Sequence, residues 1–280
     1  MTWRVNGEAV LLLGGGRALI LQVAHPKVAA GVAEFSNYRQ DPWGRLYRTL
    51  DVTLKIAFGD PRTSRAAAEG LRRAHHRVVG TDDRGEPYRA LDPDLLLWVH
   101  ATLIDTALTI YERYVAALTP RERDVYYGEM KALGEAYSIP SSAMPADHAA
   151  FRRYWASMLA EGLRITDTTH EVADALLRPD LPRLAWPAIE AIRLVTTGTL
   201  PEPLRDELGL DWGPGRERLL GASQLAIRRL LPALPALLHR FPNARAGAPA
   251  RRLIAARWRS TAGSPAPWRF AGGGGSRPPR

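Results

Sequence analysis

The chain has 280 residues, of which 46% are hydrophobic, so it is long enough to bury one substantial core. It contains no cysteine, which excludes disulfides, iron–sulfur clusters, thiolate-ligated haem and thiol nucleophiles. The net charge of +9 arises at the carboxy-terminal end, because twelve arginines and no acidic residue follow Glu217. A basic nucleic-acid-binding domain is therefore not indicated, and no nucleic acid partner is expected.

Residues 8–34 are predicted to be helical, with breaks at Gly14-Gly15-Gly16 and at His25-Pro26. The glycine triplet follows no strand and precedes no Lys-Ser/Thr pair, so it indicates close packing of helices and not a phosphate-binding loop. The first apolar stretch lacks a preceding basic segment and is interrupted by Arg17. Neither a signal peptide nor a transmembrane helix is predicted, and a cytoplasmic location is the default expectation.

The next predicted helix begins at Asp41-Pro42, an N-cap followed by a proline, and ends at Gly59. Arg45, Arg48 and Thr49 share one face of it, and that face continues into apolar residues. Burying such charges without a partner is costly, so either internal carboxylates or a bound polar group must meet them. The alternative is that the arginines extend from the helix end into solvent.

A second helix is predicted from Thr63 or Ser64 to Gly80, where glycine can end it in a left-handed conformation. His75 lies on its apolar face, whereas His76 lies at the edge of that face. An inward histidine is either a hydrogen-bonded core residue or a ligand, and the pattern leaves both open.

The connection that follows contains a turn at Asp83-Arg84-Gly85 and is a candidate for one lip of a pocket. Asp92-Pro93 then starts a helix that is predicted to reach residue 117, with His100 among apolar residues. Tyr88 and Trp98 are candidates for a cavity wall.

The rest of the chain is also helical by its periodicity. Thr119 and Glu122 form a capping box, and further helices are expected at 147–163, 167–177 and 188–197, in LPEPLRDELGL, and at 216–240 with kinks at its prolines. No strand of any length is predicted. The predicted fold is all-α, with one globular multi-helix domain at residues 1–260 and a mobile Gly/Pro/Arg-rich tail at 261–280.

Four segments of the chain resemble one helical oxygenase family: HPKVAAGVAEFSNYRQDPWGRLYRT, AHHRVVG, YRALDPDLLLWVHATL and LPEPLRDELGL. This family contains the bacterial latex clearing proteins, which are rubber oxygenases, and the fungal mycophenolic-acid-pathway oxygenase B. The resemblance extends over roughly residues 8–230. It implies a haem b enzyme that uses dioxygen, with the haem in a pocket between helices, one axial histidine, and polar groups on the opposite side of the iron.

By this resemblance His75 is the haem ligand, and Arg45, Arg48 and Thr49 form the opposite polar group, which would orient oxygen or substrate. Arg48 stands where latex clearing proteins have a lysine that can cap the iron. Because an arginine stays protonated and has no lone pair to donate, a capped resting state of that kind is not expected here. His100 is the rival ligand; otherwise it is a core histidine bonded to the backbone or to a haem propionate.

The expected substrate is an apolar small molecule, isoprenoid-like or polyketide-like, because the surrounding helices are rich in leucine, isoleucine and valine. Rubber cleavage is not implied, since the catalytic carboxylate of the rubber oxygenases cannot be placed on this chain. The alternative is a non-catalytic all-α module that binds haem or lipid and touches an anionic membrane or nucleic acid weakly through its basic tail. A helical non-haem iron enzyme would need paired Glu-x-x-His motifs, and the sequence has none.

Overall fold

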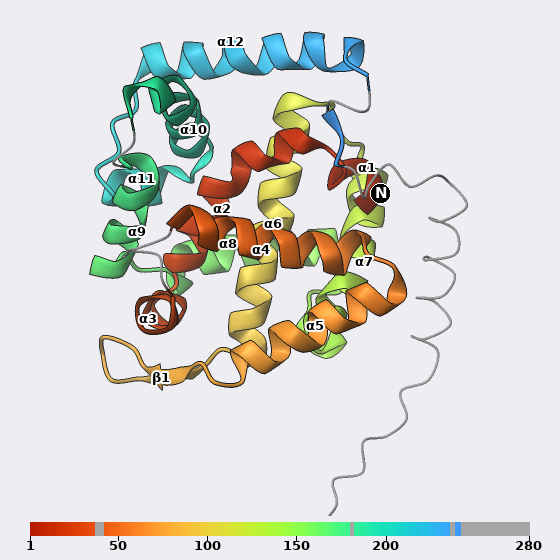
Figure 1. Ribbon diagram of the computed structural model, residues 1–280, viewed down its shortest axis with the longest axis vertical. Coiled ribbons are helices and arrows are strands. Elements are labelled where there is room, and N and C mark those ends of the chain that lie inside the picture. Colours follow the sequence, from red (N-terminus) through yellow and green to blue (C-terminus); the bar gives the residue numbers. More distant parts are fainter. Residues whose placement is uncertain (37–41, 180–181, 236–238, 242–280) are drawn as a thin grey trace, which may run out of the picture. The chain divides into compact units, whose positions relative to one another are not determined.

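Helix α6 (Pro93–Tyr114) runs through the middle of the molecule and packs against α2, α7, α12 and a short 3-10 helix, η1 (Figure 1). Asp92 caps its start by accepting a hydrogen bond from the backbone N–H of Asp94, and Pro93 occupies the first turn. Most of its residues are buried, including the polar His100 and Asp105. A helix that is covered on nearly every side is typical of the centre of a helical domain.

This computed structural model describes residues 1–36, 42–179, 182–235 and 239–241, without the side chains of residues 42, 43, 45–48 and 183. The described elements belong to one unit, Met1–Arg245. The predicted domain boundary after residue 260 and the tail at 261–280 lie outside the described residues. The elements around α6 are α1 (Thr2–Val5), η1 (Ala9–Gly14), α2 (Gly15–Val23), α3 (Pro26–Phe35), α4 (Pro42–Phe58), α5 (Pro61–His75), α7 (Pro120–Ala136), α8 (His148–Ser157), α9 (Asp167–Leu177), α10 (Trp186–Thr199), α11 (Glu202–Glu207) and α12 (Pro214–Leu230).

The all-α prediction is confirmed, with one small exception. Strands β1 (Val79–Thr81) and β2 (Pro87–Arg89) form an antiparallel hairpin, which the sequence analysis did not predict. Gly85 has φ +81° in the connecting turn, a conformation that glycine adopts without strain. Each strand has only three residues, which is too short for a periodic signal.

Helix α5 is shifted from its predicted position at both ends. It begins at Pro61, because Asp60 accepts hydrogen bonds from the backbone N–H groups of Arg62 and Thr63 and makes a strong cap. It ends at His75 and not at Gly80, because the residues from Val79 onward pair with β2. The predicted bounds of α4 are confirmed, although its predicted cap, Asp41, lies outside the described residues.

The last predicted helix is wrong in its length. Helix α12 ends at Leu230, followed by a short 3-10 turn (Leu231–Ala233), because proline lacks the N–H that a continuing helix needs. The chain then returns to the amino-terminal region. There Glu8 lies 3.0 Å from the Nδ1 atom of His239 and pairs with Arg240 in an isolated bridge.

The glycine triplet permits close helix packing, as predicted. A Cβ atom on Gly16 would lie 2.3 Å from the hydroxyl oxygen of Thr196 on α10. A Cβ atom on Gly14 would lie 2.6 Å from Thr106 on α6. Any side chain at either position would push α2 or η1 away from its neighbours.

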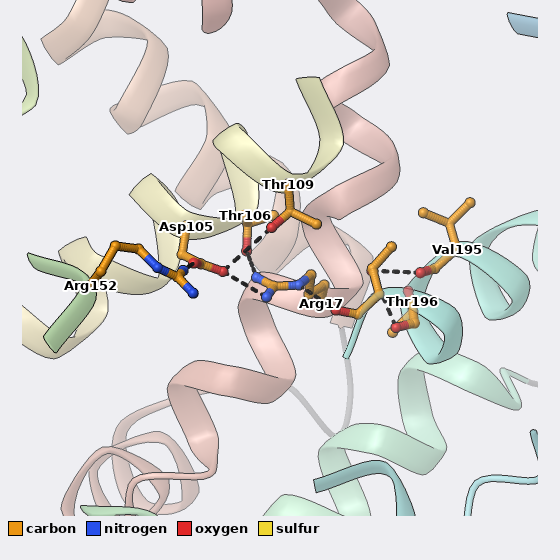
Figure 2. Close-up of polar contacts among 8 residues, drawn as sticks. Arg17, Asp105, Thr106, Thr109, Arg152, Val195 and Thr196 are labelled. Atoms are coloured by element: carbon orange, nitrogen blue, oxygen red, sulfur yellow. Dashed lines mark hydrogen bonds and ion pairs between the residues drawn. The ribbon is translucent and has the colours of Figure 1, made fainter. Parts of the chain in front are cut away.

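A buried ionic cluster, shown in Figure 2, joins four helices. The guanidinium of Arg17 on α2 donates to the carboxylate of Asp105 at 2.7 Å, to the Thr106 hydroxyl at 2.7 Å and to the backbone carbonyl of Thr199 at 2.8 Å. Arg152 on α8 donates to the other oxygen of Asp105 at 2.8 Å. Arg17 and Asp105 are 3% and 4% exposed, so this pair must be fully hydrogen-bonded to be tolerated.

No single helix among the described residues is long and apolar enough to cross a lipid bilayer. The cytoplasmic location and the weak membrane contact of the basic tail stay predictions.

Candidate functional site

A cavity of about 420 Å³ lies between α3, α4, α5 and α6, with the β-hairpin at one side. Its volume is within the range of small-molecule and cofactor sites. The wall is mainly apolar, with contributions from each of these elements: Val28 and Val32 from α3, Val52 from α4, Leu71 from α5, and Leu95, Leu96, Val99 and Leu103 from α6. The predicted lip is confirmed on the hairpin side, where Tyr88 lines the cavity. Trp98 does not line it, because its indole packs on Trp155 and donates to the carbonyl of Leu21.

His75, the last residue of α5, lines the cavity, whereas its neighbour His76 is exposed. The predicted inward direction of His75 is therefore confirmed. Burial lowers the pKa of His75 below its ordinary value, so the imidazole is neutral near pH 7. A neutral imidazole has one ring nitrogen with a free lone pair, which is the form that binds a metal.

Thr49 on α4 lines the same cavity and is exposed, so the cavity opens towards solvent near this residue. The structure thus brings Thr49 and His75 to one site from two consecutive helices. Arg45 and Arg48 lie on α4, four residues and one residue before Thr49. Their side chains are outside the described residues. Their predicted direction stays a prediction.

His100 also lines the cavity and is 2% exposed. Its Nε2 atom lies 2.8 Å from the backbone carbonyl oxygen of Met130 on α7. Because a carbonyl only accepts, Nε2 carries the proton and Nδ1 keeps its lone pair. Nδ1 is buried and has no hydrogen-bond partner in the part of the chain that the structure describes. Burial lowers the pKa of His100 to about 4, so this side chain is neutral as well.

Five polar residues of the described wall were not predicted from the sequence as site residues: Gln22, Lys27, Ser36, Thr53 and Tyr137. Tyr137 follows α7 and its ring centroid lies 5.4 Å from that of His100, while Thr53 follows Thr49 by one helical turn on α4. Burial raises the pKa of Tyr137, and interaction with Thr53 acts in the opposite direction. The spacing of Thr49 and Thr53 was a readable signal, whereas nothing near Tyr137 in the sequence marks it as a cavity residue.

None of the described residues that line the cavity is a carboxylate. In the part of the chain that the structure describes, no group of three or more histidine, aspartate or glutamate side chains is arranged to hold a metal ion. The described site therefore consists of neutral imidazoles, hydroxyl groups, the amide of Gln22 and apolar walls, with Lys27 beside the hairpin, where its ammonium donates to the carbonyl of Pro87.

Comparison with known proteins adds the family context. The sequence model described as "ER-bound oxygenase mpaB/B'/Rubber oxygenase, catalytic domain" matches residues 3–236. The chain is 31% identical over 228 residues to two proteins described as uncharacterized, Mb2261 of Mycobacterium bovis and Rv2237 of Mycobacterium tuberculosis. Each alignment covers 76% of this chain and 87% of the mycobacterial protein. No solved structure shows significant similarity to the chain.

Proposed function

The chain belongs to the family of mpaB-type and rubber oxygenases, and on this premise we propose that it is a haem-dependent oxygenase that uses dioxygen to oxidise an apolar small molecule. The observation that supports the haem most directly is the imidazole of His75, which is neutral and lies on the wall of a mainly apolar cavity. The family membership supports the oxygenase activity. The haem and the substrate class are our proposal.

The residues present fit a haem. A single imidazole is sufficient for an iron whose four equatorial ligands come from a porphyrin, whereas a protein-held ion would need several side chains. The walls from α3 and α4 are apolar and suit the faces of a macrocycle. No hydrogen bond of the His75 imidazole is present among the described residues, so its ring nitrogens are available.

Haem, when bound, supplies the redox chemistry of dioxygen. His75 would hold the iron through a ring nitrogen, and Thr49 would supply a hydroxyl, which we assign to hydrogen bonding with oxygen or to orienting the substrate. Arg45 precedes Thr49 by one helical turn, so we propose that its guanidinium acts beside that hydroxyl. Arg48 is assigned either to the same group or to pairing with a haem propionate.

The apolar walls favour an apolar substrate, of the isoprenoid or polyketide kind. Because no described residue of the lining is a carboxylate, we assign no carboxylate base to this site. Rubber cleavage is accordingly not proposed.

An optical spectrum of the full chain, purified from haem-replete cells, tests the haem directly. We expect a haem absorption band that shifts with carbon monoxide after reduction. His75→Ala should lose the band, whereas His76→Ala, the exposed neighbour, should keep it. Colourless wild-type protein that also takes up no added haemin would refute the haem, and equal loss in both variants would refute the assignment to His75.

Oxygen consumption separates the enzyme from the non-catalytic alternative. A binding module would retain haem or lipid in this cavity but would consume no more oxygen than the same concentration of free haemin. An enzyme should consume oxygen in the presence of an isoprenoid lipid extract, and Thr49→Ala should lower that rate while the haem band persists.

A further inference from the structure

The wall of the cavity contains a hydrogen-bond acceptor that meets no donor among the described residues. The Nε2–Cδ2 edge of the His100 ring faces α7, where a Cβ atom on Gly134 would lie 3.2 Å from both atoms. Nδ1 is the ring atom opposite that edge, so it points away from α7. His100 lines the cavity, and the lone pair that meets no donor among the described residues lies on the side of the ring away from α7.

A hydrogen-bond donor lies beside this acceptor. The Tyr137 ring lines the same cavity, 5.4 Å from the His100 ring between centroids and tilted by 58°. Its hydroxyl is buried and makes no hydrogen bond of ordinary geometry with the described residues, although Thr53 lies near enough to lower its pKa. Burial raises the pKa of Tyr137, so the phenol keeps its proton and can donate it. Val99 and Leu103 of α6, also in the wall, are apolar.

The two groups together select the chemistry of a ligand. An ionised carboxylate or phosphate would set its negative charge against the lone pair of Nδ1, and burial opposes protonation of His100. An ionised haem propionate is excluded from this position for the same reason. A ketone or an ether only accepts, so it would satisfy Tyr137 and leave Nδ1 without a donor. A hydroxyl does both, because it donates one proton and accepts another.

We propose that His100 and Tyr137 form a subsite for the hydroxyl group of an apolar alcohol, which donates to Nδ1 of His100 and accepts from the phenol of Tyr137. The proposal rests on the proposed function, in that it names the substrate class of the same cavity. The apolar body of the alcohol lies against Val99 and Leu103 of α6, and the subsite fixes which end of the molecule faces α7.

Calorimetric titration of the full chain with farnesol and with its methyl ether tests the subsite. The two probes share an apolar body, but only the alcohol has a proton for Nδ1. Leaving a buried acceptor without a donor is costly, so we expect the alcohol to bind about 5- to 100-fold more tightly than the ether. Equal affinities, as would result if a water molecule satisfied Nδ1, would overturn the proposal, and so would a failure of farnesol to bind.

Variants separate the subsite from a structural role of His100. His100→Leu removes the acceptor and should abolish the preference for the alcohol. His100→Gln keeps a donor for the carbonyl of Met130 and a second polar atom, so it should keep part of the preference for the alcohol. It also keeps the test possible if His100→Leu does not fold. Tyr137→Phe removes the donor and should weaken alcohol and ether alike. An unchanged preference in both folded His100 variants would refute the assignment.

The experiment is independent of haem, since it measures binding and not turnover. Protein that shows the haem band but binds alcohol and ether equally would refute the subsite and leave the proposed function intact. Protein that prefers the alcohol but neither retains haem nor consumes oxygen would support the subsite and refute the proposed function.

Discussion

Replacing Asp105 by asparagine tests whether the buried ionic cluster stabilises the fold. The substitution keeps the size of the side chain and one acceptor oxygen, but it removes the only negative charge that contacts the guanidinium of Arg17 among the described residues. Arg17 is 3% exposed, and burial lowers its pKa while the carboxylate of Asp105 opposes that shift. The variant would therefore hold a buried cation without a counter-charge.

The expected loss follows from this burial. Breaking a buried ion pair by removing one partner typically costs about 3–5 kcal/mol. Because asparagine retains one hydrogen bond to the guanidinium, the lower end, about 3 kcal/mol of unfolding free energy, is expected for Asp105→Asn. For a chain of this size that corresponds to a decrease in Tm of roughly 6–12 °C.

Arg152→Ala is the matched control, since Arg152 contacts the same carboxylate at 2.8 Å but its side chain is 56% exposed. Its loss should be below about 1 kcal/mol, as for other exposed ion pairs. Both values are measurable by urea unfolding followed by circular dichroism. If Asp105→Asn cost no more than Arg152→Ala, the burial of the charge would not be the source of the stability, and the reasoning would be wrong.

Three further predictions concern other parts of the chain. Gly16→Ala should destabilise the protein by about 1–3 kcal/mol, because the added Cβ atom would overlap Thr196, whereas Gly128→Ala, where no atom lies within 4 Å, should be neutral or stabilising. Burial lowers the pKa of His100 to about 4, so between pH 6.5 and pH 4 the unfolded chain binds a proton that the folded chain does not. The free energy of unfolding should therefore fall by roughly 3 kcal/mol as the pH is lowered through this window, and by less in His100→Gln. Urea unfolding at pH 7 and pH 4.5 measures both changes. Thr49→Ala should reduce oxygen consumption by about 10- to 100-fold without loss of the haem band, and an unchanged rate would exclude a role for this hydroxyl.

The helical fold was predictable because its start signals are local. Asp92 and Thr119 act as N-caps in the structure as their sequence contexts predict, each followed by a proline. Asp60-Pro61 has the same form. The predicted start of α5 at Thr63 or Ser64 is wrong because this cap was not taken into account. The end of α5 was not predictable in the same way, because it depends on the pairing of Val79 with Arg89 across a turn.

The candidate site was predictable in part, because a helical face can be read from spacing. The direction of His75 and the exposure of His76 follow from the period of one helix. The meeting of His75 with Thr49, and of His100 with Tyr137, depends on how separate helices pack, which spacing alone does not determine. The pairing of Arg17 with Asp105, 88 residues apart in the chain, was missed for the same reason.

Helix α6 keeps the charges of the ionic cluster apart from the cavity. His100 and Asp105 are five residues apart, so their side chains leave the helix in different directions, one to the cavity and one to the cluster with Arg17 and Arg152. Burial keeps His75 and His100 neutral, and the nearby carboxylate of Asp105 is already engaged by two guanidinium groups. An imidazole that stays neutral retains a lone pair, and a retained lone pair can bind iron or accept a proton from an alcohol. Ligands of this cavity should therefore be uncharged where they meet α6, and a carboxylate analogue of farnesol should bind more weakly than the alcohol at pH 7.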